Sequence, residues 1–209
     1  MTQETGFADT AARAIAASVV VPVIRTPSAR EALAVAEWAI AQDLPAVELT
    51  ATSPGWREAL QALRRSAPET VVGVGTLRIA EDARAACADG AGFLVSPVPA
   101  PAVARVGAEH GALVIEGGFT PAELLAAAAG GIAKLFPAHA LGPRYLRSVL
   151  AVAPPGTRVV PTGGIGLDDV EAWLDGGAYA VGVGSELAPG PQSATRLREL
   201  RASRQAVAA

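Results

Sequence analysis

The sequence predicts an α/β protein, a single-domain (β/α)8 barrel of the TIM type with an extra N-terminal helix. Short runs rich in β-branched residues alternate eight times with Ala- and Leu-rich amphipathic segments along the 209 residues. Polar residues and glycines gather at the carboxyl ends of these runs, where a barrel has its open mouth. An open, doubly wound sheet is the alternative, but the chain lacks the glycine fingerprint of dinucleotide-binding sheets, which favours a closed barrel.

Eight segments are expected to be strands because they are short, apolar and bounded by turn residues. They are residues 18–25, 46–51, 70–76, 92–97, 112–118, 132–138, 158–164 and 178–185. Helical patterns such as residues 29–42 and 121–130 fill the intervals. A cap residue beside a proline marks the start of three helices, at Thr26-Pro27-Ser28, Ser53-Pro54 and Thr120-Pro121.

We expect one domain over residues 1–209, because barrels of this length are often undivided. Residues 1–17 are expected to form a helix across the barrel bottom, residues 18–190 the barrel, and residues 191–209 a C-terminal helix.

Composition excludes several classes of function. The net charge is -3 and the arginines are scattered singly, which argues against a nucleic-acid partner. No apolar stretch is long enough for a membrane span, and the first residues lack a signal peptide, so we expect a cytoplasmic protein. Cys87 is the only cysteine and there are two histidines, so we expect no metal and no cofactor.

Lys134 is the only lysine among the 17 lysine and arginine residues. It lies within the sixth expected strand and shares a face with Phe136, which is expected to line the same pocket. Burial there disfavours the ammonium form, and a neutral amine is a nucleophile toward carbonyls. Arginine cannot lose its proton at physiological pH and could not do this chemistry. The alternative is a lysine whose stem packs while its ammonium reaches the mouth or pairs with an acid.

Other charged residues end neighbouring strands. Glu48 could move protons to and from a substrate held by Lys134, or form a structural ion pair with it. Glu116 is a second candidate for proton transfer. Arg25 could hold a carboxylate or phosphate, or be a solvated charge. His139 follows the sixth strand and is expected to be an exposed loop residue.

Glycines cluster after the last two strands, as PTGGIG (161–166) and VGVGSELAPG (181–190). Loops at these two positions of a barrel often bind phosphate through backbone N–H groups, and glycine permits the close approach. The hydroxyl of Ser185 could add a further hydrogen bond.

The motifs VPVIR, VELT, VGVGT, VSP, KLFPA, PTGG and VGVGS occur in this order over residues 18–190. With them the chain resembles the family of 2-keto-3-deoxy-6-phosphogluconate aldolases, also called KHG/KDPG aldolases. The resemblance implies a Schiff-base lysine at Lys134, an acid/base at Glu48, and pocket residues Thr76 and Pro97 around the pyruvyl end. It implies a metal-independent trimer acting on a small phosphorylated keto acid. The residues that it implies for phosphate binding are Thr162, Gly163, Gly164, Gly184 and Ser185.

The chain departs from the family pattern at two positions. Thr52 stands where many members have a carboxylate-binding arginine, which leaves Arg25 as the candidate for that role. Glu116 stands where the family commonly has proline, and is expected to bring a negative charge close to Lys134. The motifs SPGW and LGPRY are similar to those of the galactonate relatives, whereas Thr162 favours the gluconate substrate. 4-Hydroxy-2-oxoglutarate is a further candidate substrate.

Two functions of other kinds compete with an aldolase. A sugar-phosphate isomerase or epimerase could use the same phosphate site with Glu48 as the base. A non-catalytic barrel that binds a phosphorylated metabolite, its site disabled by Glu116, is the second alternative.

Overall fold

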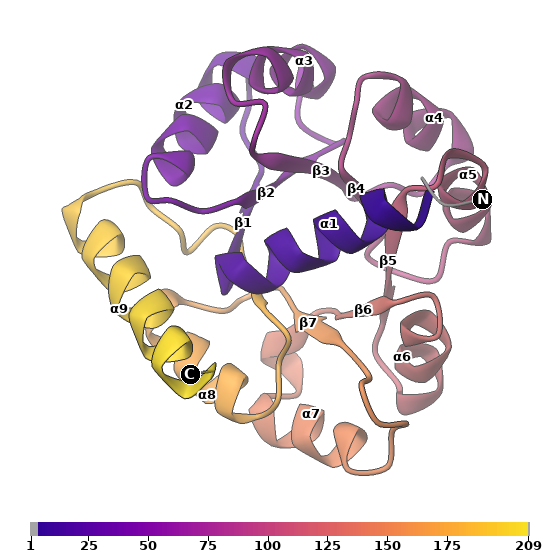
Figure 1. The fold of residues 1–209 in the computed structure, drawn as a ribbon, viewed down its shortest axis with the longest axis vertical. Helices are drawn as coiled ribbons and strands as arrows, with labels where there is room; N and C mark the ends of the chain where they lie inside the picture. The colour runs from indigo at the N-terminus through magenta and orange to yellow at the C-terminus, as the bar shows by residue number, and fades with distance from the viewer. Residues whose placement is uncertain (1–3, 209) are drawn as a thin grey trace.

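The computed structural model describes residues 4–208 and confirms the predicted barrel. Eight parallel strands follow one another around the barrel in the order β7-β6-β5-β4-β3-β2-β1-β8 (Figure 1). A bridge between Thr162 and Gly182 joins the two ends of this sheet. Every strand falls within the segment predicted for it. The strands are β1 Val20–Ile24, β2 Ala46–Thr50, β3 Val71–Gly75, β4 Phe93–Val95, β5 Leu113–Gly118, β6 Ile132–Leu135, β7 Val159–Pro161 and β8 Val181–Val183.

Helices surround the barrel as an outer ring (Figure 1). Their apolar faces and the outer face of the sheet share the larger of two core clusters. The helices after β1 to β8 are α2 Ala29–Ile40, α3 Trp56–Ser66, α4 Ala80–Ala88, α5 Pro101–His110, α6 Pro121–Ala128, α7 Pro143–Leu150, α8 Val170–Asp175 and α9 Pro191–Ala208, with 3-10 turns η1 Ala138–Ala140 and η2 Leu167–Asp169. Over residues 4–208, no helix has both the length and the apolar character that crossing a membrane requires.

Two of the three predicted helix starts are confirmed. Ser28 caps α2 by accepting the N–H of Glu31, and Thr120 forms a capping box with Glu123 at the start of α6. The third prediction, a start at Ser53, is wrong, because α3 begins only at Trp56. The Ser53 hydroxyl instead lies within hydrogen-bond distance of the Thr50 hydroxyl and accepts the N–H of Thr26.

Helix α1, Glu4–Ser18, lies across one end of the barrel (Figure 1). Its Ile15 packs against residues inside the barrel such as Val21 and Phe93, and these form the second core cluster. The Tyr179 hydroxyl donates a hydrogen bond to the carbonyl of Ala12 at 3.0 Å. This amino-terminal end of the barrel is therefore closed, and any site must open at the opposite end.

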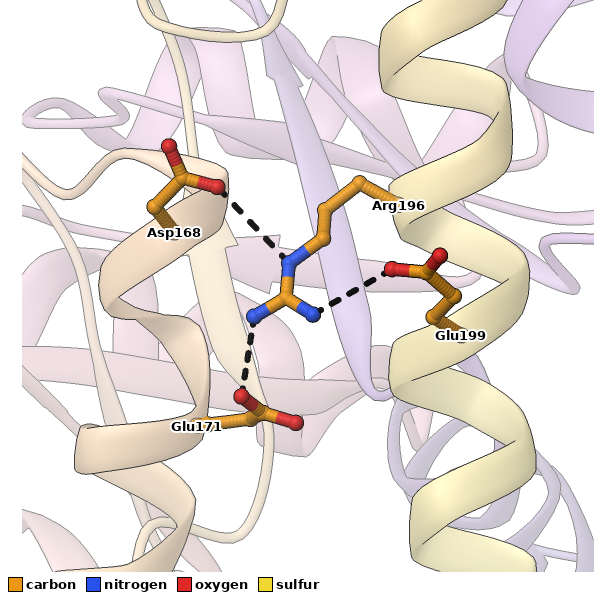
Figure 2. Close-up of polar contacts among 4 residues, drawn as sticks. All are labelled: Asp168, Glu171, Arg196 and Glu199. Atoms are coloured by element: carbon orange, nitrogen blue, oxygen red, sulfur yellow. Dashed lines mark hydrogen bonds and ion pairs between the residues drawn. The ribbon is translucent and has the colours of Figure 1, made fainter.

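Helix α9 completes the ring between α8 and α2 (Figure 1). Arg196 of α9 lies among three carboxylates, those of Asp168, Glu171 and Glu199 (Figure 2). The shortest of these contacts joins Nη2 of Arg196 to Glu171 of α8 at 2.9 Å. On the other side of α9, Arg201 donates to the carbonyl oxygen of Gln42, just beyond α2. The last helix is thereby tied to both of its neighbours.

Candidate active site

A cavity of about 800 Å³ opens at the carboxyl ends of the strands, opposite α1. Most of the residues that the sequence predicts for the site lie in its wall. They are Arg25, Thr52, Thr76, Pro97, Lys134, Phe136, Thr162, Gly163, Gly164, Gly184 and Ser185. They come from seven of the eight strands or the loops that follow them, which is how a barrel assembles a site from distant parts of a chain.

Lys134 lies at the base of this cavity and faces Glu48 from across the barrel. The two residues belong to β6 and β2, which are four strands apart in the barrel. Each side chain is only 6% exposed, and 3.6 Å separates Nζ of Lys134 from Oε1 of Glu48. The amine also lies 5.6 Å from the centre of the Phe136 ring. The only lysine of the chain is thus a buried amine beside a buried carboxyl group.

Burial raises the pKa of Glu48 above its ordinary value of 4.5, and the nearby positive charges of Lys134 and Arg25 only partly oppose this effect. Oε1 accepts no hydrogen bond from residues 4–208. A carboxyl group with a raised pKa can both hold and release a proton nearer neutral pH, which suits general acid/base catalysis.

Gly75 of β3 leaves the space that the Glu48 side chain occupies. A Cβ atom at position 75 would overlap Oε1 of Glu48. In the parallel register Thr50 lies beside Gly75, two residues after Glu48, so the carboxyl group crosses directly over the glycine. The motif VGVG therefore keeps a small residue where the acid needs room.

Arg25 and Thr76 meet at the rim of the cavity. The Arg25 guanidinium donates from Nη2 to the Thr76 hydroxyl at 3.3 Å. Thr76 has a φ of 62°, a left-handed conformation that is unusual for a β-branched residue. Arg78, two residues further on, also lines the cavity, although sequence reasoning missed it. In the sequence, the only indication that Arg78 belongs to the site is its positive charge just past the end of a strand.

The glycine loops after β7 and β8 form another part of the wall. Gly163 and Gly164 have φ values of 99° and 65°, a left-handed pair that non-glycine residues adopt only at a cost in strain. The turn packs against Phe136, because a Cβ atom on Gly163 would come within 3.0 Å of that ring. Gly184 and Ser185 lie in the same cavity wall.

The expectation that Glu116 brings a negative charge to Lys134 is wrong. In the register of β5 and β6, Glu116 lies beside Ala133, whereas Gly117 lies beside Lys134. Residues side by side on parallel strands point to the same face, so Glu116 points outward toward the helices. There its Oε1 accepts the N–H of Ala100 at 2.6 Å, at the start of α5. Glu116 is a helix cap and does not line the cavity.

The family model of the KDPG and KHG aldolases matches residues 12–198. The chain belongs to this family. Its relatives include proteins named as aldolases, so this member of the KDPG and KHG aldolases is an enzyme of the lyase class. Within residues 4–208 of this aldolase, no group of three or more His, Cys, Asp or Glu residues is arranged to hold a metal ion.

Relatives of this aldolase carry two kinds of substrate name. The chain is 29% identical to the 2-dehydro-3-deoxy-6-phosphogalactonate aldolase of Escherichia coli, over 88% of this chain and 91% of that one. It is 33% identical to the 2-dehydro-3-deoxy-phosphogluconate aldolase of Treponema pallidum, over 74% and 75%. The solved KDPG aldolase of Legionella pneumophila, captured with pyruvate as a covalent carbinolamine, superposes with a TM-score of 0.77 at 28% identity, over 92% of this chain and 96% of that one.

Proposed function

We propose that this protein is a class I, Schiff-base aldolase that cleaves 2-keto-3-deoxy-6-phosphogluconate to pyruvate and glyceraldehyde 3-phosphate. The observation that carries the proposal is the buried pair of Lys134 and Glu48, 3.6 Å apart, in which Lys134 lines the cavity and Glu48 lines the small interior space next to it. Schiff-base cleavage requires an amine that attacks the keto group and a second group that transfers protons, and these two lie side by side here.

The reaction begins when the amine of Lys134 adds to the C2 carbonyl, and the resulting carbinolamine loses water to give an iminium. Glu48 takes the proton from the C4 hydroxyl, the C3–C4 bond breaks, and its electron pair moves into the iminium to form an enamine. Glyceraldehyde 3-phosphate leaves with a new C4 carbonyl. The enamine gains a proton at C3, and water then hydrolyses the iminium to pyruvate and free Lys134. The close approach of Glu48 to Lys134 supports its role as the proton carrier.

The cavity wall offers arginines to one anionic end of the substrate and glycine N–H groups to the other, although Glu186 adds a carboxylate beside Ser185. Arg25, beside Thr76 and Pro97, is our candidate for holding the carboxylate next to C2. The phosphate would lie against Thr162, Gly163 and Gly164, with Gly184 and Ser185 on the adjoining loop. The glycine turn supports this placement, because a backbone without side chains lets a phosphate approach its N–H groups.

The configuration of the substrate at C4 defines a second candidate. Thr162, buried in the cavity wall, favours the gluconate compound in our proposal. The match to galactonate aldolases over a larger share of the chain favours its C4 epimer, the 2-keto-3-deoxy-6-phosphogalactonate. Initial rates with both epimers and with 4-hydroxy-2-oxoglutarate would decide among the three substrates.

Borohydride reduction in the presence of pyruvate tests the mechanism. The wild-type protein should gain the mass of pyruvic acid less one oxygen atom, on a peptide that contains Lys134. Lys134→Arg keeps the charge but has no nucleophilic amine, so it should form no adduct and show no cleavage. An isomerase would show no adduct, and a non-catalytic barrel would bind the keto acid without turnover. Full retro-aldol activity in Lys134→Arg would exclude the proposed mechanism.

A homotrimer is the assembly that we propose. Ile79, Val98 and Phe119 are 51%, 49% and 39% exposed, and they lie in the loops after three neighbouring strands, β3 to β5. Such a group of apolar side chains would be covered by another copy of the chain. Sedimentation equilibrium of the wild-type protein and of Phe119→Arg tests this assembly. The cytoplasmic location stays a prediction from the sequence.

A further inference from the structure

His139 stands behind the glycine turn that we propose for phosphate binding. It lies in the short turn η1, after β6, and its side chain is exposed. The backbone N–H of His139 donates to the carbonyl oxygen of Gly163 at 3.1 Å, and the ring atom Nδ1 lies 3.2 Å from the same oxygen. A carbonyl oxygen only accepts hydrogen bonds, so the ring donates to Gly163 in the tautomer that carries its proton on Nδ1.

The imidazole also packs against the next residue of the turn. A Cβ atom built on Gly164 would lie 2.7 Å from Nδ1 and 2.8 Å from Cγ of His139. The Phe136 ring lies against Gly163. The turn is thus held between two rings, and the N–H of Ala138 fixes the preceding residue by donating to the carbonyl of Thr162 at 2.9 Å.

A turn made of two glycines needs such support. Glycine has more backbone freedom than any other residue, so an unsupported Gly163-Gly164 turn would sample many conformations. A ligand that binds such a turn must first order it, and the lost conformational entropy weakens binding. His139 does not line the cavity, whereas both glycines do. The N–H of Gly164 donates to no protein oxygen within residues 4–208, which leaves it free for an anion.

We propose that His139 is a positioning residue that holds the Gly163-Gly164 turn in the conformation that binds the phosphate group of the substrate. The inference rests on the proposed function, because it needs a phosphate at this turn. It assigns a role to a residue outside the cavity, and it makes phosphate recognition depend on the Nδ1–H donor of one side chain.

Two variants of His139 and one control test the inference. His139→Ala removes the donor, whereas His139→Asn keeps a side-chain N–H close to the position of Nδ1. The control is His110→Ala, because His110, the only other histidine, ends α5 at the far end of the barrel from the cavity. For each protein we would measure kcat and KM with a phosphorylated and an unphosphorylated 4-hydroxy-2-keto acid, and the Kd of inorganic phosphate.

His139→Ala should raise the KM of the phosphorylated acid and the Kd of inorganic phosphate about tenfold, as expected for one lost hydrogen bond and a looser turn. Its kcat should stay within about twofold, since His139 does not line the cavity and its ring contacts the Gly163 carbonyl instead of the reacting groups. KM for the unphosphorylated acid should not change. His139→Asn should recover most of the loss, and His110→Ala should behave as wild type.

Unchanged phosphate affinity in His139→Ala would overturn the inference. An equal rise in KM for the phosphorylated and the unphosphorylated acid would also overturn it, because that result indicates general damage to the fold. If the wild-type protein cleaves no keto acid, the proposed function fails, but the Kd of phosphate still tests His139. If the wild-type protein forms the lysine adduct but does not bind phosphate, the inference fails and the Schiff-base chemistry stands.

Discussion

Glu48 Oε1 lies 3.6 Å from Lys134 Nζ, in a barrel interior where both side chains are almost completely buried. Such a pair is a poor source of stability, because removing two charges from water costs about as much free energy as their attraction returns. Oε1 accepts no hydrogen bond within residues 4–208 that would offset more of this cost. The pair is better explained by chemistry, since a carboxyl group of raised pKa next to an amine is suited to proton transfer.

Glu48→Gln should separate Schiff-base formation from bond cleavage. The amide cannot accept the C4 hydroxyl proton, so kcat should fall by a factor of about 10² to 10⁴. Lys134 remains, so borohydride should still trap pyruvate on it. Mass spectrometry of the reduced protein and steady-state kinetics would check the two effects. Loss of the adduct together with turnover would instead show that Glu48 is needed for Lys134 to react at all.

Stability should respond to pH through Glu48. Because the folded protein raises the pKa of this carboxyl group above 4.5, the folded state keeps its proton at pH values where the unfolded chain has released it. The free energy of unfolding therefore falls as pH rises from about 4.5 through the raised pKa, and then levels off. Glu48→Gln should lack this component, whereas Glu37→Gln on the exposed face of α2 should keep it.

Urea titrations between about pH 4 and pH 8 would measure this effect as the difference between wild type and Glu48→Gln. As pH rises, the free energy of unfolding of wild type should fall relative to that of Glu48→Gln. A difference that does not depend on pH would mean that the Glu48 carboxyl group titrates alike in the folded and unfolded chains.

Gly75→Ala should displace the carboxyl group of Glu48 and leave Lys134 in place. The backbone of Gly75 is not in the left-handed region, so the added methyl group acts only through its overlap with Oε1 of Glu48. Moving a reacting group by about 1 Å typically lowers kcat about 10²-fold. The pyruvate adduct should persist, because Lys134 is unchanged. Gly130→Ala is the control, because its Cβ atom would meet the Ala127 oxygen at 3.4 Å. Wild-type kcat in Gly75→Ala would show that the observed position of Glu48 is not required.

The strands and the central pair were predictable because they follow simple periodicities. Eight short apolar runs identified the strands, and the ends of parallel strands converge at one end of a barrel, which places Glu48 and Lys134 in one site. The error at Glu116 arose because strands buried on both faces give no alternation of polar and apolar residues, so the sequence does not show which face a residue takes. The strand register, which places Glu116 beside Ala133, shows that Glu116 points away from the cavity.

Loop positions were less predictable for a related reason. Arg78 lies past the end of β3, where no period relates a residue to the cavity. Ser53 has the chemistry of a helix cap, but hydrogen bonds to Thr26 and Thr50 occupy its hydroxyl group. His139 was expected to be exposed, and it is, yet its ring nitrogen contacts a turn 24 residues away in sequence.

Arg196→Ala should loosen the C-terminal helix. The variant loses contacts to Asp168, Glu171 and Glu199, which Figure 2 shows around the guanidinium group. Arg196 is 23% exposed and its partners more so, hence solvent screens the pairs and the cost should be only about 1 kcal/mol. Arg198→Ala is the control, because within residues 4–208 the Arg198 side chain donates a single hydrogen bond, to Thr195 one turn away. Urea unfolding should show the difference at low salt and a smaller one at high salt.

The two rim arginines should differ in their effect on the carboxylate end of the substrate. Arg25 reaches Thr76 and lies close enough to influence the pKa of Glu48, so it is near the reacting carbons. Pyruvate carries a carboxylate and no phosphate, and its Kd therefore reports on this end alone. Arg25→Ala should raise that Kd about 10- to 100-fold, as for a lost charge-assisted hydrogen bond, and Arg78→Ala should raise it less.

Thr52→Arg extends this prediction to the position where many family members carry an arginine. Thr52 lines the same cavity, so we expect an arginine placed there to approach the carboxylate from the loop after β2. In the Arg25→Ala background, Thr52→Arg should recover part of the lost pyruvate affinity, because one guanidinium group replaces another on the same anion. A larger loss in Arg78→Ala than in Arg25→Ala would move the carboxylate to the loop after β3, and Thr52→Arg would then recover nothing.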